Sequence, residues 1–434
     1  AVTLQIDTLL TIGRQYASQD ESENSRRVME HAYNLSRTVS DQALRSKAAC
    51  GYAASISDAG DYARAHAIAT DALAALPGGA MYVLDRVYCR TLLGVVERSG
   101  PNPAAAVDVL RTAHDELNAS GLGSPLLHVS VMMQLAESYR TAGRPREAAK
   151  GFEDAYDVLV SIGRGDTETA GTFLNNWALT MLDLGQPREA ERLFRRAVDI
   201  ASADGTDTSV SPMLLTNLAR PLMDLGRYRE AVDIADRASV LATEAGYTVV
   251  YNQGLLLRAG IYRQLGDFAR AGALLDEFGV RAARDIPPGH MAHDLLVTDR
   301  GRLDAARGDT AAAAAAFDRA IAALDMPDDD RRLGLQRALL SRARLRLDTG
   351  QGAAALADAE RLVQLVRASS DESAMNCNLG RAWLVLGQTL AVSARDDEAR
   401  RALDTARRHL EATLGADHAE ARETRMALAA LDGR

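Results

Sequence analysis

A short turn sequence recurs along the chain and constrains its fold more than any other feature. Its copies begin at Ala59, Ala142, Leu184, Leu225, Leu265, Arg307 and Thr349, so that neighbouring units are offset by about 40 to 43 residues. Each copy places a glycine where one helix ends in a left-handed residue, and most follow it with an acidic residue or proline that suits the first turn of the next helix. The pattern predicts a chain built from one repeated helical hairpin.

The composition agrees with a helical chain of one continuous kind. Hydrophobic residues make up 47% of the 434 residues but aromatic residues only 5%, and alanine, arginine and leucine are abundant. These are good helix formers, whereas the β-branched and aromatic residues that favour strands are scarce. Because no Pro/Gly/Ser-rich linker divides the chain, we expect a single architecture from residue 1 to residue 434.

Small and large residues flank the turns in a fixed phase. The stretch that runs from Phe173 illustrates it with Trp177, Ala178, Ala190, Phe194 and Ala197. This pattern resembles the tetratricopeptide repeat, in which a large residue and a small residue of the first helix are followed by A-x3-F in the second. About ten units in phase cover nearly the whole chain. Their long period is similar to that of the repeats in kinesin light chains and in the arms of bacterial signalling proteins.

The resemblance implies an all-α fold, a right-handed α-solenoid of about ten hairpins. We expect the first hairpin over residues 1–38, successive hairpins over 41–416 and a capping helix over 417–432. Two helices cross closely only where their side chains are glycine or alanine, and a neighbouring large residue fills the space beside the crossing. One hairpin cannot bury its apolar stripe alone, so stacked neighbours bury it for each other.

Charge and cysteine content limit the partners and the compartment. The net charge of -9 argues against direct binding of nucleic acid or of an anionic membrane. No apolar run approaches the length of a membrane helix. Cys50, Cys89 and Cys377 lie far apart, so we expect no disulfide framework and a reducing, cytoplasmic compartment. The chain opens on residues that already read as helix, and we therefore expect a segment of a larger signalling protein.

No sequence motif indicates catalysis, and we predict a protein that is not an enzyme, with no cofactor and no metal. The phosphate-binding, zinc-protease, hydrolase and dinucleotide fingerprints are absent from the sequence. His290 and His293 lie one helical turn apart, but we interpret them as a pair at a helix start. The acidic run between Met326 and Arg332 lacks the glycine and the distal glutamate of a calcium loop, which indicates a solvated loop.

Amide side chains are the first candidates for binding. In the tetratricopeptide resemblance, an asparagine just before the large residue of the first helix reaches the backbone of an extended peptide, and Gln134, Asn176 and Asn217 occupy that place. An amide both donates and accepts, so it can satisfy a peptide whatever its side chains. The alternative is that these amides are solvated or bridge neighbouring helices. Asn175 is expected to face the adjacent repeat.

Arginines form the second candidate set. They recur near the small position of the first helix in several units, as Arg220, Arg263, Arg302 and Arg344. On an acidic chain, such arginines along one concave face would create a local positive groove for carboxylate or phosphate. The alternative is that they form ion pairs between repeats.

The sequence therefore predicts a non-catalytic interaction scaffold whose partner is a protein or a peptide ligand. The preferred ligand is an extended, acidic segment held in the groove. Two alternatives stay open. One is an arm of a bacterial transcription regulator that senses a small molecule or a signalling peptide, and the other is a structural scaffold that assembles as a homodimer.

Overall fold

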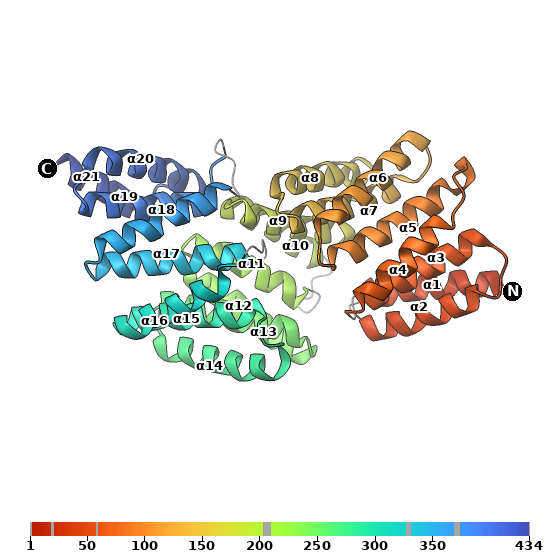
Figure 1. Cartoon of the computed structure of the whole chain (residues 1–434), viewed down its shortest axis with the longest axis horizontal. Helices are drawn as coiled ribbons and strands as arrows, with labels where there is room; N and C mark the ends of the chain where they lie inside the picture. The colour runs from red at the N-terminus through yellow and green to blue at the C-terminus, as the bar shows by residue number, and fades with distance from the viewer. Residues whose placement is uncertain are drawn as a thin grey trace. The chain divides into compact units, whose positions relative to one another are not determined.

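The chain folds into helices that follow one another as antiparallel hairpins (Figure 1). The computed structural model describes residues 2–18, 21–57, 60–202, 210–326, 331–368 and 374–433. All regular structure within these ranges is helical, and besides the α-helices it contains one 3₁₀ turn, η1 (Ala80–Tyr82). The expected all-α solenoid is confirmed. The turn glycines adopt the predicted left-handed conformation; Gly185, for example, has φ +66° and Gly226 has φ +74°.

The described residues divide into two compact units, residues 1–177 and 178–434, with the boundary inside one helix, α9. Unit 1 contains α1 (Val2–Ser18), α2 (Ser22–Ser36), α3 (Gln42–Ser57), α4 (Tyr62–Ala74), α5 (Val83–Arg98), α6 (Ala104–Ser120), α7 (Pro125–Thr141), α8 (Pro145–Ser161) and the first part of α9 (Glu168–Asp183). Helices α1 to α8 pack as consecutive pairs, and each pair packs on the next.

Unit 2 contains the rest of α9, the remaining hairpins and a final single helix. Its other helices are α10 (Pro187–Ala201), α11 (Pro212–Asp224), α12 (Tyr228–Glu244), α13 (Thr248–Gln264), α14 (Phe268–Asp285), α15 (Met291–Arg307), α16 (Thr310–Leu324), α17 (Arg332–Asp348), α18 (Gly352–Ala368), α19 (Cys377–Val392), α20 (Asp396–Thr413) and α21 (Ala419–Asp432). The last helix packs against α20 and α19.

Small residues bring the two helices of a hairpin together, as in α15 and α16. A side-chain carbon at Gly301 of α15 would lie 2.9 Å from the methyl group of Ala316 and 2.9 Å from the ring of Phe317. Phe317 itself is fully buried. The glycine therefore fixes how closely α16 approaches, and the ring fills the space beside the crossing.

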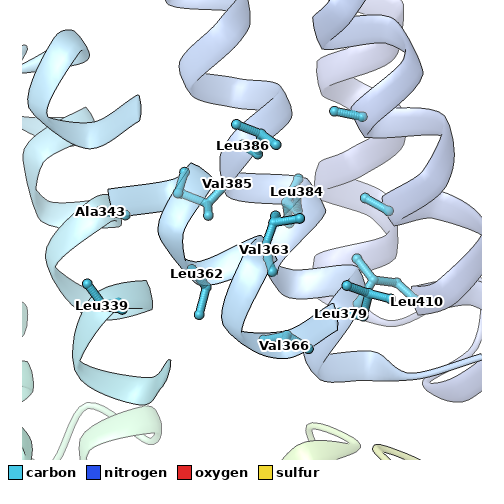
Figure 2. Close-up of a cluster of buried hydrophobic side chains, with 14 of the residues drawn as sticks. Leu339, Ala343, Leu362, Val363, Val366, Leu379, Leu384, Val385, Leu386 and Leu410 are labelled. Carbon is cyan, nitrogen blue, oxygen red and sulfur yellow. The ribbon is translucent and has the colours of Figure 1, made fainter. Parts of the chain in front are cut away.

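The same rule extends from one hairpin to the next. Figure 2 shows Leu362, Val363 and Val366 of α18 packed toward residues of α17 and α19, among them Leu339 and Val385. All five side chains are at least 95% buried. The apolar face of α18 is thus covered by α17 on one side and α19 on the other, so these hairpins share one core.

The cysteines differ from the sequence-based prediction. Cys50 of α3 and Cys89 of α5 form a disulfide, with their Cα atoms 5.5 Å apart, while Cys377 is free and buried. The two positions are 39 residues apart, close to one repeat length, so both lie on the first helices of neighbouring hairpins. Stacking brings these helices into contact. The expectation of unpaired cysteines was wrong because distance along a repeat chain does not measure distance in space.

The disulfide is expected to stabilise unit 1. Closing a loop of this length removes chain entropy from the unfolded state, on the order of 3 to 4 kcal/mol. We expect Cys50→Ser to lower the free energy of unfolding in urea by up to that amount. Reductant should have the same effect on the unmodified chain and none on the variant. A reductant effect of equal size in both proteins would contradict the assignment.

Candidate functional site

Arginine side chains gather inside unit 2, from the first helices of four consecutive hairpins. We call this set the arginine cluster; its members are Arg263 of α13, Arg302 of α15, Arg337 and Arg344 of α17, and Arg381 of α19. Only three carboxylates pair with these arginines among the described residues, Asp224, Asp299 and Glu420. Because five cations face three anions, the cluster is locally positive on a chain that is acidic as a whole.

Asp299 of α15 organises one half of the cluster. Its Oδ1 atom accepts hydrogen bonds from Arg337, at 2.6 Å, and from Arg302, at 3.3 Å. The side chain is only 5% exposed, and its Oδ2 atom has no hydrogen-bond partner within the described part of the chain. One carboxylate therefore serves two guanidinium groups and retains an unused acceptor.

Arg263 lies beside this group without a carboxylate of its own. Among the described residues, none of the acidic side chains comes within ion-pair distance of it, and its guanidinium donates to the Gln264 side chain at 3.5 Å. Burial lowers the pKa of Arg263; Asp299 opposes this shift, whereas Arg337 adds to it. Burial also lowers the pKa of Arg302, together with the charges of Arg337 and Arg263. The three guanidinium groups thus repel one another in a partly buried place.

Glu420 of α21 organises the other half. It accepts from Arg381 at 2.8 Å and from Arg344 at 3.0 Å, and Arg381 also pairs with Asp224 at 3.1 Å. Burial disfavours the charged form of Glu420, but Arg381 and Arg344 outweigh it and bring its pKa down to about 2. This half of the cluster is a structural ion-pair network whose charges are well matched.

Unit 2 also makes contacts between helices far apart in the sequence. The Arg381–Asp224 pair joins α19 to the end of α11, and the Cys377 amide donates to the carbonyl of Gly185 at 2.9 Å. His418, just before α21, lies against the turn at Gly226. The C-terminal helices of unit 2 therefore contact α11 and the turns at Gly185 and Gly226. The arginine cluster includes Arg381, which makes one of these contacts.

Three of the four predicted arginines lie in the arginine cluster, and their role in ligand binding stays a prediction. The structure brings Arg263, Arg302 and Arg344 together, although Arg344 is paired with Glu420, as the alternative of ion pairs between repeats requires. Arg220 of α11 is partly buried and has interactions of its own. Arg337 and Arg381 were missed. A signal for both exists, since each precedes the small motif residue of its helix, Ala343 or Gly387, by six positions.

The predicted amides make contacts between neighbouring repeats. In unit 1, Arg98 of α5 donates to Gln134 at 2.9 Å and pairs with Glu137 at 3.1 Å, and Asn176 of α9 donates to Glu137 at 2.6 Å. Burial raises the pKa of Glu137 against the opposing charge of Arg98. Asn175 donates to Asn176 at 2.9 Å. These contacts match the alternative in which the amides bridge neighbouring helices.

Asn217 of α11 lies in unit 2 and is buried, with 3% of its surface exposed. It has interactions of its own within the protein. Its role in peptide binding, like that of Gln134 and Asn176, stays a prediction.

The histidine pair lies at a helix start, as expected. His290 caps α15 by accepting from the Ala292 amide at 3.2 Å, and His293 lies 3.2 Å from the carbonyl of Pro287. Within the described residues, no group of three or more His, Cys, Asp or Glu side chains is arranged to hold a metal. Residues 327–330 of the acidic loop lie outside the described residues.

Two surface hollows of unit 2 lie away from the arginine cluster. One, of about 420 Å³, lies between α14 and α15 and is lined by Asp276 and Arg300 among others. The other, of about 340 Å³, lies over α19 and α20 beside Trp383. Neither is lined by an arginine of the cluster, so the cluster remains the stronger candidate. No helix in the described ranges is long and apolar enough to cross a membrane.

The pKa of Glu420 leads to a prediction about acid stability. Because its folded pKa is lowered from 4.5 to about 2, the carboxylate contributes stability above pH 4.5 that is lost as the pH falls toward 2. Glu420→Gln should lower the free energy of unfolding at pH 7 by on the order of 3 kcal/mol and flatten its acid dependence. Glu423→Gln on the same helix, where the side chain contacts Gln388, is the control. Urea unfolding at several pH values would refute the assignment if both variants behaved alike.

The comparisons with known proteins agree with the repeat architecture. A family model described as tetratricopeptide repeat matches residues 127–203. No curated protein matches the chain by sequence. Among solved structures, a Rap protein complexed with Competence and Sporulation Factor is similar, with 15% identity and a TM-score of 0.62, over 85% of this chain and 99% of that one.

Two further structures are similar at the level of the fold. Aspartyl phosphate phosphatase F from Bacillus subtilis has 14% identity and a TM-score of 0.55, over 84% of this chain and 94% of that one. The apo form of the quorum sensor NprR from B. thuringiensis has 12% identity and a TM-score of 0.52, over 85% of this chain and all of that one. The predicted resemblance is confirmed: residues 127–203 match the tetratricopeptide repeat, and the chain shares the fold of solved structures built from such helical hairpins.

Proposed function

We propose that the chain is a non-catalytic scaffold that binds an extended, acidic segment of a partner protein or a peptide inside unit 2. The observation that carries the proposal is the arginine cluster, which presents guanidinium groups from α13, α15, α17 and α19 in succession. An extended segment crosses successive hairpins, so one ligand can meet several of these arginines. Guanidinium groups bind carboxylates through paired hydrogen bonds, which favours acidic side chains at intervals along the ligand.

The overall charge of the protein makes a local positive site necessary for such a ligand. At a net charge of -9 the surface as a whole repels an acidic segment. The cluster reverses this sign where the ligand would bind, and its partly buried position reduces screening by salt. Separately, in unit 1, Gln134 and Asn176 remain proposed hydrogen-bond partners of a peptide backbone, after exchanging part of their present contacts.

The proposal is tested by measuring the affinity of the full chain for short labelled peptides rich in Asp and Glu, using fluorescence polarisation. Arg302→Ala should weaken binding about tenfold and reduce its dependence on salt, because it removes one of the arginines that share the single carboxylate Asp299. Arg300→Ala is the matched control, since Arg300 pairs with Asp276 of α14 away from the cluster. Peptides with Gln and Asn in place of the acids should bind weakly.

Equal binding of acidic and amide peptides would reject the proposal. Asn176→Ala and Asn217→Ala test the amides separately, and unchanged affinity in both would remove them from the binding site. Assembly of the ligand-free chain into a dimer with increasing concentration, without peptide binding, would instead favour the structural scaffold.

A second function, a sensing arm for a signalling peptide or small molecule, is favoured by the contacts that join the ends of unit 2. A ligand bound among these helices can strengthen or weaken the Arg381–Asp224 and Cys377–Gly185 contacts. Two of the similar structures are described as a quorum sensor and as a complex with Competence and Sporulation Factor, which supports the same reading at the level of fold.

Hydrogen exchange distinguishes sensing from passive binding. The Cys377 amide, which donates to Gly185, reports on the contact between the first turn and the last hairpins. A sensing arm should change the exchange rate of this amide about tenfold or more when ligand binds. An unchanged rate in the saturated complex would leave only the passive scaffold.

A further inference from the structure

The arginine cluster contains one arginine that has no carboxylate partner of its own among the described residues. Asp224 and Glu420 are matched by Arg381 and Arg344, and Asp299 is shared between Arg302 and Arg337. Arg263 is left over. Within the part of the chain that the structure describes, it has no carboxylate at ion-pair distance, although the fold partly buries it.

An unmatched charge of this kind is unfavourable in a folded protein. Removing a guanidinium from water without an anion costs free energy, and two further guanidinium groups nearby add repulsion. Partial exposure relieves some of the cost because water reaches the side chain. The groups around Arg263 do not neutralise its positive charge. Asp299 already accepts hydrogen bonds from two other arginines, and Tyr228 is uncharged when protonated. Arg344 adds a further positive charge.

Asp299 is thus the carboxylate that acts on all three arginines, through hydrogen bonds to Arg302 and Arg337 and through its charge on Arg263. We propose that Arg263, Arg302 and Arg337 form a subsite for one oxyanion of the bound ligand, a carboxylate or a phosphoryl group. The three side chains come from three successive first helices, α13, α15 and α17, so they approach the anion from different elements. This inference rests on the proposed function for the identity of the ligand, and it adds where along unit 2 the ligand places its principal charge.

Asp299 acts in this subsite as a positioning residue. It holds Arg302 and Arg337 through its Oδ1 atom, at 3.3 and 2.6 Å. Its own charge also opposes the incoming anion, which limits affinity. An amide at this position keeps the acceptor for both arginines and removes the negative charge. Substitution of Asp299 and of Arg263 should therefore change anion affinity in opposite directions.

Calorimetric titration of the full chain at constant ionic strength tests the subsite, with inorganic phosphate, acetate and an acidic peptide as probes. Arg263→Met and Arg302→Met should weaken binding of the preferred oxyanion about tenfold, whereas Asp299→Asn should strengthen it several-fold. Arg300→Met controls for loss of an arginine from α15 outside the cluster. Preference for phosphate over acetate assigns a phosphoryl ligand, and the reverse assigns a carboxylate.

A stability measurement separates a binding residue from a structural one. Because Arg263 has no anionic partner, Arg263→Met should leave the urea midpoint unchanged or raise it while binding is lost. A lower midpoint together with unchanged oxyanion affinity would overturn the subsite. Acidic peptide that binds equally to Arg263→Met and the unmodified chain would also overturn it but leave the proposed function standing. Phosphate binding that depends on Arg263, without any peptide binding, would support the subsite and reject the proposed function.

Discussion

Close crossing of paired helices is the constraint on which the rest of the structure depends. Glycine at a crossing, as at Gly301, lets two helices approach until a large neighbour such as Phe317 fills the remaining space. Once each crossing is fixed, the apolar stripe left on the outside of a hairpin must be covered by the next hairpin. The order of the helices along the chain therefore sets the order in space within each unit, and the polar faces of the first helices are aligned as a result.

This alignment explains how an acidic chain can hold a positive interior. The arginine side chain is long, so its methylene groups can pack along a helix while its guanidinium group lies between repeats. Where carboxylates answer the arginines, as Glu420 does, the interaction is structural. Arg263 has no carboxylate partner among the described residues, so its partly buried charge lowers the stability of the folded protein. Both kinds of arginine occur in one cluster, which is why position in the repeat alone does not separate structural from functional residues.

The turns, the helix pairs and the buried motif residues could be predicted because each depends on residues close in the sequence. Gly185 and Phe194 show this for one unit. The Cys50–Cys89 disulfide was not predicted, because a large separation in the sequence was taken to mean a large separation in space. The reducing compartment was inferred from unpaired cysteines, and the disulfide removes that argument. The pairing of Arg381 could not be predicted, because its partners, Asp224 and Glu420, come from helices that no repeat pattern connects. The amide contacts of Asn176 depend on Glu137 of the preceding hairpin, one repeat away.

The contact between the Cys377 amide and Gly185 limits how unit 2 can evolve. Arrays of helical hairpins ordinarily gain or lose repeats without harm, because each repeat touches only its neighbours. Here α19 must also meet α11 and the turn before α10. Duplication or deletion of a hairpin between α11 and α19 would change the distance between these two helices. A change in the number of hairpins between these elements would therefore break the Arg381–Asp224 and Cys377–Gly185 contacts.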